Sequence, residues 1–123
     1  MARIRHIALF TQDTHALAAF YTTTFGMHEV MRRDKTNGAV YLSDGYINLA
    51  ILPNTGAEAN GAPEGIHHFG FEVDDVDTFA QNALRAGAME GRSNAPLDGR
   101  FAEAYIKDPT GQRIDLSAGG WKV

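Results

Sequence analysis

The chain has 123 residues, of which 44% are hydrophobic and 21% charged, a profile that predicts one compact globular domain rather than a disordered chain. Its formal net charge of −4, without any run of lysine or arginine, disfavours nucleic acid and anionic membrane surfaces as partners. The absence of cysteine excludes disulfides, thiolate metal sites and a cysteine nucleophile, so any bound metal would take imidazole and oxygen ligands.

The first half of the chain predicts a strand, a helix and three short strands. Residues 3–10 predict the first strand, and Asp13 or Thr14 is placed to cap a helix that ends near Phe25. The helix carries one apolar stripe at three- and four-residue steps, made of Leu17, Phe20, Tyr21 and Phe25. Hairpin dipeptides follow, and the strands they separate are expected at about 28–34, 38–43 and 46–52.

The second half repeats this order after a small, polar segment rich in proline and glycine. Residues 66–73 predict a strand and residues 75–86 a helix, whose apolar positions are Val76, Phe79, Ala83 and Leu84. Weaker strands are expected near 88–92, 100–107 and 112–118. The fold class is therefore α+β, one domain of two tandem βαβββ modules forming a curved mixed sheet. The modules lie at about 3–52 and 66–118, with a linker at 53–65 and a tail at 119–123.

The two modules align with each other at polar positions. His6-Ile7-Ala8-Leu9 corresponds to His68-Phe69-Gly70-Phe71, and Ile47-Asn48-Leu49 corresponds to Ile114-Asp115-Leu116. Two copies of about this length indicate a duplicated module with a pseudo-twofold axis rather than a solenoid.

Alternation of side chains along a strand places these polar residues on one face of each sheet. If the apolar residues of each strand pack against the helix, the opposite face, here called the open face, carries His6, Asn48, His68 and Asp115. The same alternation puts His67 on the packed face. If the two sheets curl together, the four polar residues converge on one cavity. Two imidazoles and one carboxylate are the ligands that Fe(II) takes in sites with open positions.

Four stretches of the chain match a known family. They are His6-Ile7-Ala8-Leu9, Ala19-Phe20-Tyr21 with Phe25-Gly26-Met27, Gly65-Ile66-His67-His68-Phe69, and Asp108-Pro109-Thr110-Gly111 before Arg113-Ile114-Asp115-Leu116. In order and spacing the chain resembles the vicinal-oxygen-chelate superfamily, which includes glyoxalase I, methylmalonyl-CoA epimerase, extradiol dioxygenases, fosfomycin-resistance transferases and bleomycin-binding proteins.

The resemblance implies one divalent metal, held by His6, His68 and Asp115, with its identity open among Fe, Mn, Ni, Zn and Mg. Asp115 stands where the family usually has Glu. Asn48 stands where glyoxalase I has Glu and some epimerases have Gln, and we expect it to be a hydrogen-bonding pocket residue rather than a ligand.

Other side chains are candidates for contact with substrate. Tyr105 matches a pocket tyrosine of the dioxygenases and fosfomycin transferases, and Glu103, on the same strand face, is a possible proton acceptor; the alternative is an exposed amphipathic strand. Arg100 and Arg113 could bind an anionic substrate, although an isolated arginine more often lies in solvent.

These observations favour a metal-dependent enzyme acting on a small molecule chelated through adjacent oxygens. Glyoxalase- or epimerase-like lyase or isomerase chemistry is preferred, because no histidine follows His68 to act as the helper of extradiol dioxygenases. An extradiol-type dioxygenase and a metal-free drug- or ligand-binding protein remain the alternatives.

The sequence also suggests an assembly and a location. The phenylalanine-rich helices and the tail with Trp121 supply apolar surface for a homodimer. The apolar part of the first ten residues is too short for a signal peptide, and no segment approaches the length of a membrane span, so we expect a cytoplasmic protein.

Overall fold

The computed structural model describes residues 1–56, 59, 61–93 and 104–123, which fall into two compact units. The N-terminal unit comprises residues 6–67 together with Lys122 and Val123. The C-terminal unit comprises residues 68–121 together with residues 1–5. Residues 1–5 therefore belong to the C-terminal unit, and residues 122–123 belong to the N-terminal unit. Within the described residues, no helix has the length and apolar character needed to cross a membrane.

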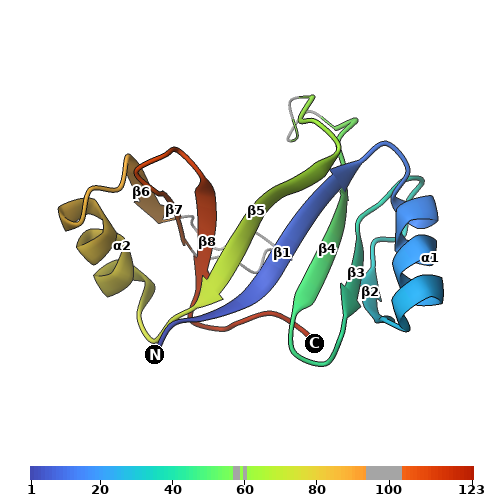
Figure 1. Ribbon diagram of the computed structural model, residues 1–123, viewed down its shortest axis with the longest axis horizontal. Coiled ribbons are helices and arrows are strands. Elements are labelled where there is room, and N and C mark those ends of the chain that lie inside the picture. Colours follow the sequence, from blue (N-terminus) through green and yellow to red (C-terminus); the bar gives the residue numbers. More distant parts are fainter. Residues whose placement is uncertain (57–58, 60, 94–103) are drawn as a thin grey trace. The chain divides into compact units, whose positions relative to one another are not determined.

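The N-terminal unit contains most of β1 (Arg3–Thr11), followed by a helix and three strands (Figure 1). These elements are α1 (Thr14–Phe25), β2 (His28–Arg32), β3 (Val40–Ser43) and β4 (Asn48–Pro53). The strand order is β2-β3-β4-β1, with β1 parallel to β4 and the other neighbours antiparallel.

The C-terminal unit repeats this arrangement with β5 (Gly65–Glu72) in the place of β1. Its other elements are α2 (Val76–Arg85), β6 (Glu90–Ser93), β7 (Ala104–Lys107) and β8 (Arg113–Ser117). The strand order is β5-β8-β7-β6, with β5 parallel to β8 and the remaining pairs antiparallel. The predicted α+β class, with two βαβββ modules and mixed strand pairing, is confirmed.

The two helices begin at equivalent aspartates. The Asp13 carboxylate accepts a hydrogen bond from the Ala16 backbone N–H at 3.0 Å, so Asp13 and not Thr14 is the cap of α1. Asp75 accepts from the Asp77 N–H at 3.2 Å and caps α2. Because an uncapped helix leaves its first N–H groups without partners, these aspartates determine where each helix starts.

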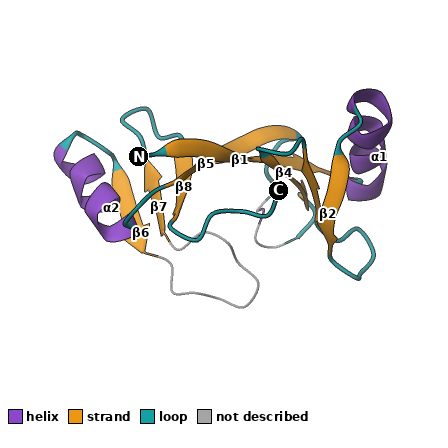
Figure 2. Cartoon of the chain, turned by 90° about the horizontal axis from the view of Figure 1, so that it is seen from below, coloured by secondary structure: helices purple, strands orange, loops and turns teal. Residues whose placement is uncertain are grey.

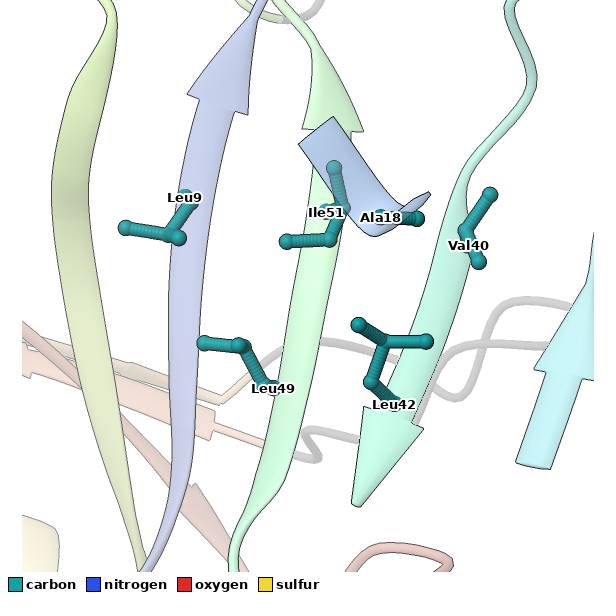
Figure 3. Close-up of a cluster of buried hydrophobic side chains, with 6 residues drawn as sticks. All are labelled: Leu9, Ala18, Val40, Leu42, Leu49 and Ile51. Carbon is teal, nitrogen blue, oxygen red and sulfur yellow. The ribbon is translucent and has the colours of Figure 1, made fainter. Parts of the chain in front are cut away.

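The core of the N-terminal unit lies between α1 and the strands β1, β3 and β4 (Figure 3). It consists of Leu9, Ala18, Val40, Leu42, Leu49 and Ile51. The helix turns a face through Thr14, Leu17, Ala18 and Tyr21 toward this core. The expected stripe is therefore wrong at two positions, because Phe20 and Phe25 lie outside that face and remain 52% and 67% exposed.

The core of the C-terminal unit lies between α2 and the strands that it covers. Val73, Ala104, Ile114 and Leu116 are buried there, with Phe69, Phe71, Val76 and Phe79 packed around them. Figure 2 shows α2 alongside β6 and β7. Leu84, expected on the apolar face of this helix, is instead 49% exposed. This core, like that of the first unit, leaves the other face of its strands to polar residues.

The tail after β8 returns across the open face of β5. Ser117 Oγ accepts a hydrogen bond from the Gly120 N–H at 2.9 Å, and Gly120 has a left-handed φ of 73°. Trp121 then packs on Gly70, where a Cβ atom would lie only 2.7 Å from the indole Cη2. Trp121 is 8% exposed, so the surface that it was expected to offer to a second chain is used within this one.

Replacing Gly70 by alanine should dislodge the indole. The added methyl group leaves no room for Trp121, so we expect the free energy of unfolding to fall by about 1–3 kcal/mol. Trp121 is the chain's single tryptophan, so its fluorescence emission should move to longer wavelength. Gly91→Ala is the matched control, because a Cβ there meets no atom closer than 3.4 Å. Unchanged emission and stability in Gly70→Ala would contradict the packing described.

Candidate functional site

In the C-terminal unit, His68 and Asp115 meet on the open face. Asp115 lies opposite Gly70 in the β5–β8 pairing, and its neighbours Ile114 and Leu116 point into the core. His68 Nε2 lies 3.2 Å from Asp115 Oδ2, and both side chains are buried. The structure thus brings together two of the three predicted metal ligands.

Arg113 holds the other oxygen of the same carboxylate. Its Nε–H donates to Asp115 Oδ1 at 2.9 Å. Burial is the largest influence on Asp115 and by itself raises the pKa, but the hydrogen bond and charge of His68, together with Arg113, outweigh it. The pKa of Asp115 therefore lies below its usual value, and the group is a carboxylate at neutral pH.

Tyr105 lies beside Asp115 on the neighbouring strand. It is the cross-strand partner of Asp115, and the guanidinium carbon of Arg113 lies 4.3 Å from the centre of its ring. Its hydroxyl donates to Glu90 Oε1 at 3.0 Å, and Lys107 Nζ lies 3.4 Å from Glu90 Oε2. Sequence reasoning missed Glu90, although its place opposite Lys107 on a neighbouring strand could have indicated it.

The predicted residues Glu103 and Arg100 lie outside the described part of the chain. Their proposed contacts with substrate therefore stay predictions.

In the N-terminal unit, His6 and Asn48 form a second buried pair. They are direct partners in the β1–β4 pairing, and His6 Nδ1 lies 3.1 Å from Asn48 Oδ1. The other end of the amide, Nδ2, donates to the backbone oxygen of Lys122 at 2.8 Å. His6 is 4% exposed and Asn48 1%. Both Asn48 groups thus have partners within the chain.

His67 does not lie in the packed face that alternation predicted. It is exposed, and its ring meets the edge of Phe10 with centroids 4.8 Å apart. The reason is position: the side chains of β5 that pack in a hydrophobic core begin at Phe69, two residues further along the strand.

Comparison with known proteins adds a family to this geometry. Residues 3–116 match the sequence model of the Glyoxalase/Bleomycin resistance protein/Dioxygenase superfamily. An ethylmalonyl-CoA/methylmalonyl-CoA epimerase of Cereibacter sphaeroides is 27% identical, over 94% of this chain and 97% of its own length. A probable chloroplastic lactoylglutathione lyase of Arabidopsis thaliana is also 27% identical over 93% of this chain, which spans only 35% of that relative.

A solved structure of an epimerase has a similar fold. The structure of a variant Streptomyces coelicolor methylmalonyl-CoA epimerase, in complex with 2-nitronate-propionyl-CoA, superposes with a TM-score of 0.68. It is 26% identical to this chain and covers 94% of it and 97% of its own length.

The Arg113–Asp115 contact generates a pH-dependent prediction for the metal-free protein. Arg113→Met removes a hydrogen bond and a positive charge, so the pKa of Asp115 should rise, as measured by the ¹³C shift of its carboxyl carbon. Because its folded-state pKa is lowered, Asp115 stabilises the fold above the unfolded-state pKa, and this stabilisation is lost as pH falls through the folded-state value. The variant should lose it at higher pH than the wild type.

Lys107→Met is the control for this measurement. It also removes one positive charge, but that charge pairs with Glu90. If the pKa of Asp115 is the same in Arg113→Met as in the wild type, Arg113 does not control this carboxylate.

Proposed function

We propose that this chain, which belongs to the Glyoxalase/Bleomycin resistance protein/Dioxygenase superfamily, is a metal-dependent lyase or isomerase of a small molecule. His6, His68 and Asp115 would hold one divalent ion, and the substrate would bind that ion through two adjacent oxygens. Lyase and epimerase relatives support this reaction class over the extradiol dioxygenase alternative.

The separation of His68 and Asp115 is the observation that carries the proposal. Nitrogen and oxygen ligands that share an ion at about 2.1 Å lie about 3.0–3.4 Å apart at tetrahedral to octahedral angles. His68 Nε2 and Asp115 Oδ2 lie 3.2 Å apart, a spacing that fits two ligands of one ion. The lowered pKa of Asp115 supplies the charged form that a metal requires.

The assignment of His6 as the third ligand is supported by its chemistry and its place in the chain. It is buried, it offers an imidazole nitrogen, and it belongs with His68 and Asp115 to the donor types that divalent ions bind. It stands at the position of the first module that corresponds to His68 in the second.

When bound, the ion supplies Lewis-acid stabilisation of the negative charge that develops on the substrate oxygens. The chain's own residues would do the rest. Tyr105 and Glu103 are proposed for hydrogen bonding to a substrate oxygen and for accepting a proton, and Arg100 for binding an anionic group. Arg113, proposed from sequence for substrate, already contacts Asp115, so its first role would be to hold that carboxylate.

Hydrogen exchange tests the function directly. Lactoylglutathione and methylmalonyl-CoA, named by the relatives, both carry a C–H bond beside a thioester carbonyl. Protein loaded with metal should exchange this hydrogen for deuterium in D₂O with at least one of them, as read by NMR, and a chelator should stop it. Oxygen uptake with ring opening of a catechol would instead establish the dioxygenase.

The same experiment identifies the ligands. Wild-type protein should contain about one divalent ion per chain, whereas His6→Ala, His68→Ala and Asp115→Ala should lose both metal and exchange. His67→Ala is the control, because His67 is an exposed neighbour in the same strand. Wild-type protein that binds none of Fe, Mn, Ni, Co or Zn would overturn the enzyme and favour the metal-free binding protein.

We also propose that the chain forms a homodimer. Its interface would be formed by the exposed face of α1 and not by the tail, because Trp121 is buried. Phe20 and Phe25 are exposed and stack edge-on with centroids 6.2 Å apart, next to Tyr21. Light scattering should give twice the chain mass, and Phe20→Ser with Phe25→Ser should shift it toward the monomer. A wild type that is monomeric at micromolar concentration would refute this assembly.

A further inference from the structure

The buried amide of Asn48 joins His6 to the C-terminal end of the backbone. On one side its Oδ1 lies 3.1 Å from His6 Nδ1, and on the other its Nδ2 donates to the Lys122 oxygen at 2.8 Å. Residues 48 and 122 are 74 positions apart in sequence, so this link forms only in the folded chain. Asn48 is 1% exposed, which shields both contacts from competing water.

The Lys122 oxygen fixes which way the amide faces. A carbonyl oxygen only accepts hydrogen bonds, so the NH₂ group of Asn48 must face Lys122 and its oxygen must face His6. The amide oxygen is also an acceptor only, so His6 Nδ1 must carry the proton of this contact. In a neutral imidazole the lone pair then lies on Nε2.

The surroundings hold this arrangement in place. His6 and Asn48 are direct partners on parallel strands, so the backbone sets their side chains beside each other. Lys122 follows Trp121, whose ring is packed on Gly70, so the end of the chain has a defined path. A Glu or Gln at residue 48 would carry its polar end group one methylene further from the backbone than Asn48 does.

We propose that Asn48 is a positioning residue, which together with the Lys122 carbonyl holds His6 as its Nδ1–H tautomer and presents Nε2 as the metal-binding nitrogen. This rests on the proposed function for the part that concerns metal. It gives Asn48 a role other than ligand or substrate contact, and it gives the backbone oxygen of Lys122 a role in the site.

Two pairs of variants separate the contact of Asn48 with His6 from its contact with the Lys122 oxygen. Asn48→Leu has similar volume and removes both contacts, whereas Asn48→Asp keeps an acceptor for His6 Nδ1–H. Deletion of residues 122–123 removes the Lys122 carbonyl, whereas deletion of Val123 alone leaves an acceptor oxygen at Lys122, now part of the terminal carboxylate. Asn54→Ala is a further control, because Asn54 also donates to a backbone oxygen, that of Ala62, but beyond the other end of β4.

The first readout is the tautomer of His6 in metal-free protein. Long-range ¹H–¹⁵N spectra of histidine-labelled protein at mildly alkaline pH distinguish Nδ1–H from Nε2–H. We expect Nδ1–H in the wild type, in Asn48→Asp, in Asn54→Ala and after loss of Val123. Asn48→Leu and the deletion of residues 122–123 should give mixed tautomers.

The second readout is the affinity for Zn²⁺ alone, measured by competition with a chromophoric chelator. Asn48→Leu should bind about 10- to 100-fold more weakly, as is usual when a partner of a metal-bound histidine is lost. The two-residue deletion should also weaken binding, and Asn48→Asp and Asn54→Ala should not.

The outcomes separate this inference from the proposed function. An Nε2–H tautomer in the wild type, or an unchanged tautomer and Zn²⁺ affinity in Asn48→Leu, would overturn the positioning role. A wild type that shows Nδ1–H but binds no Zn²⁺ would overturn the metal site and with it the presentation of Nε2 to metal, whereas the Asn48–Lys122 control of the tautomer would stand.

Discussion

The alternation of side chains along β1, β4, β5 and β8 is the constraint on which both core and site depend. In each strand the apolar residues pack against the helix of their own unit, as Leu9 and Leu49 do in one and Ile114 and Leu116 in the other. Because side chains alternate along a strand, the polar residues between them must lie on the opposite face. A one-residue shift of register would exchange the two sets, so the same packing that stabilises each unit also places its polar groups.

Burial of those polar groups imposes a second condition, because an unpaired buried polar group is costly. Each unit meets it with a short chain of contacts. In one, Asp115 is held by His68 and Arg113; in the other, Asn48 lies between His6 and Lys122. In both sets of contacts a histidine side chain pairs with a residue of the neighbouring strand, so the strand pairing sets the orientation of its ring.

Much of this follows from local rules and could be read from the sequence. The order of elements, the capping aspartates and the open face of the four polar residues depend on spacing within a segment. The exposure of Phe20 and Phe25 does not, because it depends on how α1 is rotated on its sheet. The same holds for Trp121 on Gly70, Tyr105 with Glu90 and Asn48 with Lys122, since each joins segments that only the folded chain brings together.

The pairings in the two units depend on the short side chains of Asp115 and Asn48. A metal ligand works best when its orientation and protonation are set before the ion arrives, because less free energy is then spent on ordering it. Arg113 occupies Oδ1 of Asp115 and leaves Oδ2 toward His68, while the lowered pKa keeps the group charged. An aspartate has one fewer rotatable bond than a glutamate, so fewer contacts are needed to orient it. The Asn48 side chain likewise contacts His6 and the Lys122 oxygen together, so its orientation is fixed from both ends of the amide.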